Sequence, residues 1–378
     1  MAAIKAWLAT LAAMLRDPGV LLLALVAPVL YSFFYPWPYL NQVPTRVPVA
    51  LVDADHSGLT RQIARYADAS PKLALRLVTG DEREAQAAMQ RREIEGYAVL
   101  PPELKRHVLR GDAVVVPVVG DGAYFLLNKV VLAGLAESVG TVSAGVEIRK
   151  LRARGQGAAQ AGASRSPIQL QLVPLYNPSE GYGSYVVPAV AVLIVHQTLL
   201  IAVALWAGTW FETRPAGRLR DWWPRLAAGA TLGLASGAWF FQAAFRLFDY
   251  GQAAHPLAQG LLLALLAWAA AALGVALGAV FADRERAMQV LLFSSIPMVF
   301  LSGFSWPAEA LAPPLRALAA LLPTTPAIQG LLRVNQMDAT LADVRPQLLH
   351  LAVLAGAATA LAFAALARRR QVDVKLSR

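Results

Sequence analysis

YVVPAVAVLIVHQTLLIAVALWA, residues 185–207, is an apolar stretch interrupted only by Pro188 and the polar residues at 196–198. An α-helix rises 1.5 Å per residue, so about twenty apolar residues span the hydrocarbon core of a bilayer. Trp210 and Phe211 follow the stretch, and arginines occupy positions 214, 218 and 220. Interfacial aromatic residues followed by arginines are typical of the cytoplasmic end of a span. The chain therefore divides here, with one predicted anchor and a large polar region before the stretch and mostly apolar sequence after it.

The composition predicts an integral membrane protein. Of the 378 residues, 57% are hydrophobic and 15% are charged, and the mean hydropathy is +0.48. Soluble domains are charged at roughly one residue in four. The length accommodates about six spans and one extramembrane domain of ordinary size.

Charge, cysteine count and missing motifs exclude several classes of function. The net charge is +10, but no basic cluster is interleaved with stacking aromatic residues, so no nucleic-acid partner is expected. The chain has no cysteine, which excludes disulfides, thiolate metal sites and cysteine nucleophiles. It has no GxxxxGK[ST] loop and no credible catalytic set in its membrane half, so it is not expected to be an enzyme. Energy for transport would come from another chain or an ion gradient, and the lack of acidic residues within the spans disfavours proton coupling.

The N-terminus is predicted to form two helices. Residues 1–16 place apolar side chains on one face, which predicts an amphipathic helix in the inner membrane interface; the alternative is an extension of the first span. Residues 17–38 are predicted to be the first transmembrane helix. Bulky aromatic residues and prolines follow it at 35–39 instead of a small-residue cleavage site, so this segment is expected to be a retained anchor.

Residues 40–175 are predicted to form an extracytoplasmic domain. β-rich runs at 47–53, 73–78, 97–100 and 113–119 alternate with helical patterns at 59–67, 81–92, 103–109 and 123–152. Strands that alternate with helices indicate a mixed α/β fold. Residues 155–166, rich in Gly, Ala, Gln and Ser, are expected to be mobile.

Residues 183–368 are predicted to form a transmembrane domain with five further helices. Its apolar segments are roughly 185–207, 226–245, 257–281, 288–304 and 348–366. Four prolines divide 307–345 into pieces too short to cross, so outer re-entrant or interfacial helices are expected there. Arginines concentrate in the inner links and in a basic cytoplasmic tail at 369–378, which places both termini inside. The predicted fold class is an α-helical integral membrane protein with six transmembrane helices and an inserted mixed α/β extracytoplasmic domain.

Glycines occur at four-residue spacing in the third and fourth spans. They are Gly229, Gly233 and Gly237 in one span and Gly274 and Gly278 in the other. This spacing forms a groove that lets another helix approach closely. The pattern leaves open whether that helix belongs to the same chain or to a second protomer.

Polar residues within the spans are candidates for a substrate path. An ionisable or amide group in a span is costly unless it faces a partner or a wet cavity. The candidates are His196, Gln197, Gln289, Ser294, Ser295, Pro297 and Phe304. Internal packing is the favoured alternative for His196 and Gln197, and Pro297 predicts a kink in a fifth span that is either a moving gate or only bent. No metal site is expected, since no second ligand lies at helical spacing from His196.

Five short motifs occur in an order that resembles one known family. They are Arg16-Asp17-Pro18, VDADHS at 52–57, Tyr176-Asn177-Pro178, LSGF at 301–304 followed by Trp306-Pro307, and LPTTP at 322–326. The layout is similar to that of the permease subunits of ABC-2 type exporters, specifically the bacterial class with a large periplasmic domain between the first and second of six transmembrane helices.

The resemblance implies function and partners. It implies export across the bacterial cytoplasmic (inner) membrane, with ATP and Mg bound by a separate cytoplasmic ABC ATPase and no cofactor on this chain. It also implies a homo- or heterodimer of permease protomers in membrane lipid, with the engagement of a periplasmic adaptor left open. The segments implied to contact the ATPase contain Ile4, Trp7, Leu8, Leu11, Glu212, Arg214, Arg218, Arg220, Asp221, Trp222, Asp283, Arg284, Glu285 and Arg286.

One alternative from another class stays open. The chain could be a membrane-anchored receptor or envelope scaffold that acts through its outer domain, although the segment from Arg368 to Arg378 is too short for a signalling domain. The apolar spans do not distinguish drugs, lipids, polymers and peptides as substrates.

Overall fold

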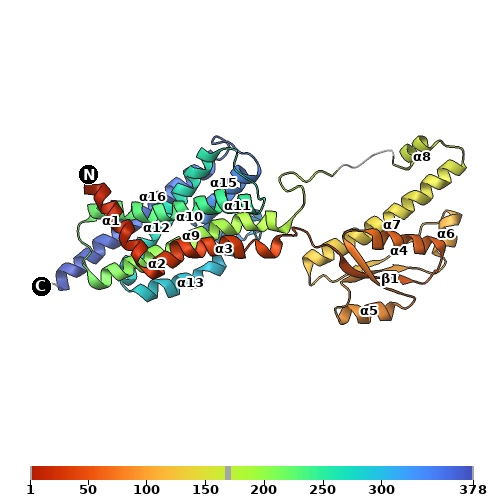
Figure 1. Ribbon diagram of the computed structural model, residues 1–378, viewed down its shortest axis with the longest axis horizontal. Helices are drawn as coiled ribbons and strands as arrows, with labels where there is room; N and C mark the ends of the chain where they lie inside the picture. Colours follow the sequence, from red (N-terminus) through yellow and green to blue (C-terminus); the bar gives the residue numbers. More distant parts are fainter. Residues whose placement is uncertain (1, 167–171, 377–378) are drawn as a thin grey trace. The chain divides into compact units, whose positions relative to one another are not determined.

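A computed structural model describes residues 2–166 and 172–376 and divides into two units (Figure 1). The helical unit is Met1–Gln42 with Pro174–Arg378, and the α/β unit is Val43–Val173. Met1, residues 167–171 within the predicted outer domain, and the last two residues of the predicted basic tail lie outside the described residues.

A four-stranded sheet is the centre of the α/β unit. Its strands are β1 (Val47–Asp53), β2 (Leu73–Thr79), β3 (Gly96–Leu100) and β4 (Val118–Gly120), in the order β2-β1-β3-β4. The first three are parallel, and β4 is antiparallel to β3. The helices of this unit are α4 (Gly58–Ala69), α5 (Glu82–Gln90), α6 (Leu104–Arg110), α7 (Phe125–Ala153) and α8 (Ala158–Arg165).

Strand β1 is apolar almost throughout because both faces of the sheet are covered. Its odd-numbered residues Val47, Val49 and Leu51 pack with residues of α4 and α7. Its even-numbered residues Ala50 and Val52 pack with residues of α5 on the other face. This is the pattern expected of a strand buried in a parallel sheet.

The VDADHS motif closes β1 and starts α4. Asp53 is buried, and its Oδ1 accepts hydrogen bonds from the backbone N–H groups of Asp55 (3.1 Å) and His56 (2.8 Å). Its Oδ2 accepts one from Thr60 Oγ1 at 2.9 Å. Ser57 is the N-cap of α4 and accepts from the backbone N–H of Leu59 at 3.2 Å. The motif therefore satisfies backbone donors that would otherwise be unpaired at a strand-to-helix turn.

One strand prediction in this unit was wrong, and one segment expected to be mobile contains a helix. The strand predicted at 113–119 is only the three-residue edge strand β4, because Val114 and Val116 turn into an apolar cluster instead of pairing. The mobile segment predicted at 155–166 contains α8. Alanine is a strong helix former, and Ala161 of α8 is fully buried.

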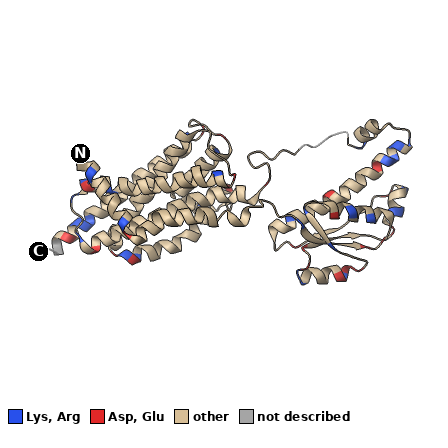
Figure 2. Cartoon of the chain, in the orientation of Figure 1, with Lys and Arg blue, Asp and Glu red and all other residues tan. Residues whose placement is uncertain are grey.

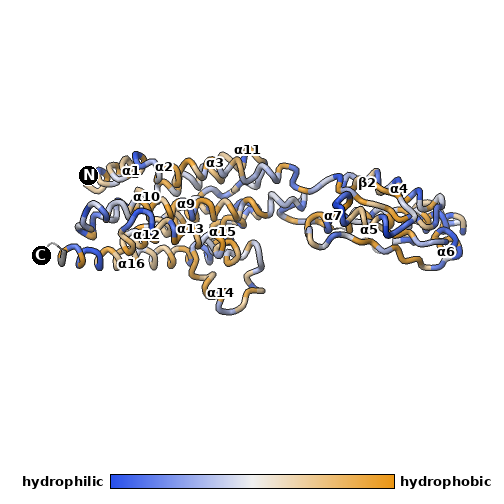
Figure 3. The backbone as a smooth tube through the Cα atoms, turned by 90° about the horizontal axis from the view of Figure 1, so that it is seen from below, coloured by the Kyte–Doolittle hydropathy of each residue, from blue (hydrophilic) through white to orange (hydrophobic). Residues whose placement is uncertain are grey.

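The helical unit contains the remaining elements. In chain order they are α1 (Ala2–Arg16), α2 (Pro18–Leu21), η1 (Leu22–Val26), α3 (Ala27–Phe34), η2 (Trp37–Tyr39), α9 (Tyr182–Thr213), η3 (Leu219–Asp221), α10 (Trp222–Ala238), η4 (Trp239–Ala244), α11 (Phe245–Leu247), α12 (Pro256–Phe281), α13 (Arg284–Leu301), η5 (Ala308–Ala310), α14 (Pro313–Ala320), α15 (Thr324–Gln336) and α16 (Arg345–Leu376). Figure 3 colours each residue by hydropathy, and hydrophobic residues, in orange, predominate in the middle of these helices.

Five described segments are long and apolar enough to cross a membrane. They are Pro18–Tyr39, Phe125–Ala153, Tyr182–Thr213, Pro256–Phe281 and Arg345–Val374. Four of these coincide with predicted spans, whereas Phe125–Ala153 is α7, whose apolar side chains pack on the sheet. The pair α14 and α15 meets the same test together but is bent by 76°, as in a broken span or a re-entrant loop.

The predicted third and fifth spans do not meet this test alone. A π-helical turn, η4, interrupts the third after the 17 residues of α10. The fifth is α13, which has 18 residues and begins with Arg284, Glu285 and Arg286. Pro297 does not end α13, which continues to Leu301.

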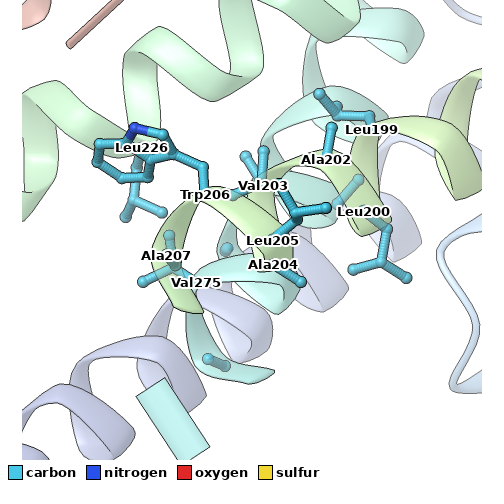
Figure 4. Packing of buried hydrophobic residues seen from close by; sticks show 14 of the residues in the cluster. Leu199, Leu200, Ala202, Val203, Ala204, Leu205, Trp206, Ala207, Leu226 and Val275 are labelled. Atoms are coloured by element: carbon cyan, nitrogen blue, oxygen red, sulfur yellow. The ribbon is translucent and has the colours of Figure 1, made fainter. Parts of the chain in front are cut away.

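Helix α9 is the centre of the helical unit. It is hydrophobic on all sides, and 78% of the residues in its most apolar 18-residue stretch are buried, as expected of a helix surrounded by others. Figure 4 shows its side chains packed with Leu226 of α10 and Val275 of α12. Helices α12 and α13 pack along α9, and α16 packs along α12.

The π-helical turns connect the first and third hydrophobic segments. A π-helical turn disturbs the regular backbone hydrogen bonding of a helix. The carbonyl of Ala24, in η1, accepts a hydrogen bond from Ser236 Oγ on α10. Trp239, at the start of η4, donates its Nε1–H to Ser32 Oγ on α3 at 3.0 Å. Both contacts are hydrogen bonds between helices, and they pair polar groups that would otherwise be unsatisfied in an apolar environment.

All five spaced glycines contact other helices of the same chain. A Cβ on Gly233 would lie 2.2 Å from a side-chain carbon of Leu199, and one on Gly274 would lie 2.8 Å from Val203 Cβ. Gly229 and Gly237 face Val203 and Leu263 at 3.0–3.1 Å. Small residues therefore let α10 and α12 approach α9 and each other closely.

We predict that Gly278→Ala destabilises the helical unit. Its added Cβ would lie 2.5 Å from Ala207 Cβ and 2.9 Å from the carbonyl oxygen of Ala204. Overpacking of this kind costs about 1–3 kcal/mol, so the thermal unfolding midpoint in detergent should fall. Gly260→Ala on the same helix is the matched control, since its Cβ would meet nothing within 4 Å. Equal midpoints for the two variants would contradict the close packing of α12 on α9.

Candidate functional site

An ion pair joins three segments at the end of the helical unit that holds both termini. Arg284 Nη1 lies 2.6 Å from Asp17 Oδ2, and Arg284 Nη2 lies 2.8 Å from Asp17 Oδ1, a two-pronged contact. Arg284 Nη1 also donates to Thr209 Oγ1 at 2.7 Å, and the Arg284 backbone N–H donates to Glu212 Oε1 at 2.6 Å. We call Asp17, Thr209, Glu212 and Arg284 the junction. It connects the start of α2, the end of α9 and the start of α13.

N-cap hydrogen bonds at the starts of α2 and α13 position Asp17 and Arg284. Asp17 is the N-cap of α2 and accepts from the backbone N–H groups of Gly19 (2.9 Å) and Val20 (3.2 Å), with Pro18 as the first helical residue. Asp283 caps α13 in the same way, accepting from Glu285 and Arg286 at 2.9 and 2.8 Å. Because each cap fixes where its helix begins, Asp17 and Arg284 are held in position before they pair.

Two glycines allow the segments to approach. A Cβ on Gly208 would lie 2.6 Å from the carbonyl oxygen of Asp283. A Cβ on Gly19 would lie 2.9 Å from Arg284 Nη2. A larger residue at position 208 would push the start of α13 away from α9, and one at position 19 would displace the Arg284 guanidinium.

The junction is partly shielded from solvent. The side chains of Arg284 and Asp17 are 31% and 18% exposed. Hydrogen bonds from Arg284, and then those from the backbone N–H groups of Val20 and Gly19, hold the pKa of Asp17 below its usual value against the opposing effect of burial. Asp17 is therefore charged and paired at neutral pH.

An aromatic cluster lies beside the junction on α9 and α10. Trp222 is fully buried and stacks on Phe211 with ring centroids 5.2 Å apart. Trp210 packs edge-on against Trp222 at 5.9 Å, and the guanidinium of Arg225 lies 4.2 Å from the centre of the Trp210 ring. Such cation–π contacts keep the charge of an arginine at an apolar boundary. Arg214 lies over the same ring at 4.7 Å.

The segment from Thr213 to Trp222, which we call the link, is fixed by hydrogen bonds with α10 and α16. Trp222 Nε1 donates to the carbonyl of Ala216 at 2.8 Å, and Asp373 of α16 accepts from the backbone N–H of Ala216 at 2.8 Å. Arg369 of α16 lies 3.4 Å from Asp373 and 3.3 Å from the carbonyl oxygen of Phe211. The ends of α9 and α16 are thus connected through this link.

A groove of about 540 Å³ separates α1 from the link. Small residues of α1 form one wall, and aromatic and charged residues of α9, α10 and the link form the other. Its lining residues are Ala2, Ala3, Ala6, Ala9, Thr10, Ala13, Trp206, Trp210, Arg214, Arg220, Asp221, Pro224 and Arg225.

The structure separates the predicted ATPase-contact residues into two groups. Trp7, Leu11, Trp222 and Arg284 face the interior; Trp7 Nε1, for example, donates to Thr231 Oγ1 at 3.2 Å. The exposed residues are Ile4, Leu8, Glu212, Arg214, Arg218, Arg220, Asp221, Glu285 and Arg286, and Asp283 is half-buried. All three predicted segments lie at the end of the helical unit where charged residues gather around both termini (Figure 2).

Sequence reasoning missed several residues of this region. Asp17 was noted as part of a motif but not as a partner of Arg284, and Thr209, Arg369 and Asp373 were not identified. The four-residue spacing of Arg369 and Asp373 on a helix was a usable signal, because side chains at that spacing face each other. The pairing across 267 positions between Asp17 and Arg284 has no local signal.

The predicted path residues are only partly brought together. Gln197 Nε2 donates to the carbonyl of Leu291 at 2.8 Å and to Ser294 Oγ at 3.0 Å, which joins α9 to α13. His196 is buried, and within the described residues neither of its ring nitrogens has a hydrogen-bond partner. The side chains of Gln289 and Pro297 are exposed, and those of Ser295 and Phe304 are half-buried.

The acidic residues of this region form no metal cluster within the described part of the chain. Within residues 2–166 and 172–376, no three His, Asp or Glu side chains are grouped to hold a metal ion. The acidic groups of the junction are used in hydrogen bonds between helices, which suits a mechanical connection better than chemistry.

We predict that Arg284→Ala destabilises the junction by about 1–3 kcal/mol, because it leaves the Asp17 carboxylate partly buried and unpaired. Asp17→Asn should cost less, since the amide oxygen still accepts hydrogen bonds. The lowered pKa of Asp17 makes the stabilisation by the charged pair complete above the ordinary carboxyl pKa, and it is lost as pH falls through the lower folded-state value.

Thermal unfolding of both variants and of the parent chain at several pH values between 5 and 8 tests this. The difference between parent and Asp17→Asn should be constant across that range. A difference that grows or shrinks there would show that another group titrates at the junction. Arg286→Ala, which removes a more exposed ion pair, is the matched control.

Comparison with known families identifies the class of protein. A family model described as ABC-2 family transporter protein matches residues 18–367. No curated protein matches the chain. The match begins at the first residue of α2 and ends within α16, so it includes both units and every residue of the junction except Asp17. The chain therefore belongs to the ABC-2 transporter family, whose members are membrane permease components of ABC transporters.

Proposed function

We propose that this chain is the permease subunit of an ABC-2 type exporter. It moves a substrate out across the bacterial cytoplasmic membrane, and a separate ATPase chain binds and hydrolyses ATP with Mg. The observation that carries the proposal is the junction, which connects the three segments predicted to face the ATPase to three different hydrophobic helices.

The proposed topology has six spans with both termini in the cytoplasm. The continuous helix from α10 to α11 is the third span, and α13 is the fifth. The concentration of arginines near both termini supports this orientation by the positive-inside rule (Figure 2). The α/β unit then belongs outside the cytoplasm, and α14 with α15, bent by 76°, forms a re-entrant or interfacial pair.

The junction supplies a route for coupling. The ATPase would contact the exposed residues of α1, of the link and of the start of α13. Displacement of the Asp283–Arg286 segment would act on α2 through Asp17 and on α9 through Glu212 and Thr209. Because Arg284 bonds both to Asp17 at the start of α2 and to Thr209 and Glu212 of α9, the first, second and fifth spans would move together and not one at a time.

A second protomer would face α13. Only Ala287 and Leu291 of this helix are buried within the chain, whereas Phe293, Ile296 and Phe300 are 85%, 69% and 60% exposed. The bond from Gln197 to Ser294 lies where α13 meets α9, so it would be close to a path between two protomers. Homodimer and heterodimer are both compatible with this arrangement.

Purification of the tagged chain from its host in mild detergent tests the proposal. We expect a stoichiometric ATPase chain to co-purify and ATP hydrolysis to accompany it. Absence of an ATPase under several gentle conditions would overturn the exporter assignment and favour the receptor or scaffold alternative.

We predict that the double variant Arg218→Glu and Arg220→Glu weakens ATPase association by about tenfold or more. Both side chains are exposed and neither is part of the aromatic cluster, so the fold should be unchanged. Reversal of charges at an interface costs several kcal/mol, and 1.4 kcal/mol is tenfold in affinity. Deletion of the whole link would be a poorer test, since it removes the buried Trp222.

Pull-down of the ATPase with the double variant measures this effect. Arg76→Glu with Arg83→Glu, two exposed arginines of the α/β unit, is the matched control and should leave association unchanged. Full association with the double variant would remove the link from the proposed interface.

A further inference from the structure

An open groove crosses the α/β unit between α4, α6 and α7. It consists of two adjoining hollows of about 560 and 410 Å³. The hollows share Leu59, Val108, Val146 and Lys150, so they form one continuous groove. Small-molecule sites in proteins have volumes of about 300–1,000 Å³.

The groove is lined mainly by aliphatic side chains. Ile63, Leu104 and Val142 are buried in one apolar cluster that forms its floor. Leu59 and Val108 are partly exposed and belong to the same cluster. The cluster is thus an apolar core left open on one side, a state that costs free energy unless something covers it.

The backbone around α6 explains why the groove is open. Helix α6 has only seven residues, and it lies between Glu103 and Gly111, which both adopt positive φ (56° and 96°). These turns end the helix abruptly at both sides, so it borders the groove without closing it. Long α7 supplies the opposite wall through Val139, Val142 and Val146.

Cations predominate at the rim. Lys105, Arg149 and Lys150 line the second hollow, and none of the three side chains forms an ion pair with a described residue. Arg165 of α8 borders the first hollow. The two acids are Glu147 and Asp112, and Asp112 Oδ2 lies 3.0 Å from His107 Nδ1. Figure 2 shows Lys and Arg gathered near the end of α7.

We propose that this groove binds an amphiphile with a single apolar chain and an anionic head, of the fatty-acid class. The chain lies over Ile63, Val108 and Val142, and the carboxylate is bound by Lys150 with Arg149 or Lys105. The apolar floor favours a hydrocarbon chain, and the unpaired cations select a negative head over a neutral or positive one. The site is separate from the junction and does not depend on the proposed transport function.

Photo-crosslinking of the full-length chain in lipid nanodiscs tests the proposal, with a diazirine-bearing decanoate as probe. Peptide mapping separates labels in the groove from labels that the bilayer delivers to the membrane helices. We expect labelled peptides from α4, α6 and α7. Decanoate should compete at least tenfold better than decanol or decyltrimethylammonium. Equal competition by decanol would overturn the anionic head, and label spread evenly over the α/β unit would overturn the site.

Two variants with matched controls locate the two parts of the ligand. Val146→Trp fills the wall shared by both hollows and should reduce groove labelling at least tenfold, whereas Val115→Trp, at an 80% exposed position outside the groove, should not. Arg149→Glu with Lys150→Glu should give a similar loss, and Arg83→Glu on α5 should have no effect. Arg149 is exposed and Lys150 is half-buried at the edge of the groove, so these charge changes are not expected to unfold the unit. Unchanged labelling in the double variant would by itself refute the proposal.

Discussion

The ion pair between Asp17 and Arg284 is the contact on which the arrangement of the helical unit depends. It is the point where the break after α1, the end of α9 and the start of α13 meet. Charged groups at the boundary of an apolar unit are costly unless they are paired, and here Asp17 also caps the N-terminus of α2. Coupling between distant parts of a transporter requires such a shared contact, because a helix that slides freely against its neighbours transmits no displacement.

The packing around α9 makes this contact effective. Glycine and alanine along α10 and α12 bring backbones within direct contact of α9, so the core behaves as one body with little room for independent shifts. By contrast, α13 packs along α9 but buries only two of its own residues, and polar contacts join it to α9 at Gln197 and at the junction. The other side chains of α13 are half-buried or exposed within the chain.

In the α/β unit, buried and capping side chains mainly satisfy backbone hydrogen bonds. The buried carboxylate of Asp53 binds the turn after β1, and Ser57 caps α4. The hydrogen bonds of the VDADHS motif therefore stabilise the turn between β1 and α4. The feature of this unit that packing does not explain is the open apolar cluster under α6, where the helix is too short to cover the residues beneath it.

The sequence by itself determined the membrane class, the family and most element positions. Hydropathy identified Pro18–Tyr39, Tyr182–Thr213, Pro256–Phe281 and Arg345–Val374, and alternating strand and helix patterns located β1, β2, β3 and α7 within a few residues. These signals are local, because periodicity, capping and turn chemistry depend on residues close in the chain.

Only the tertiary structure decided which segments meet. It paired Asp17 with Arg284 and Gln197 with Ser294, shortened β4, formed α8 and placed the apolar face of α7 on a sheet. Length and hydropathy alone do not separate α7 from a membrane span, since both bury apolar side chains. The physical reason is that burial and pairing depend on partners tens to hundreds of positions away, and no local pattern encodes which partner a side chain will reach.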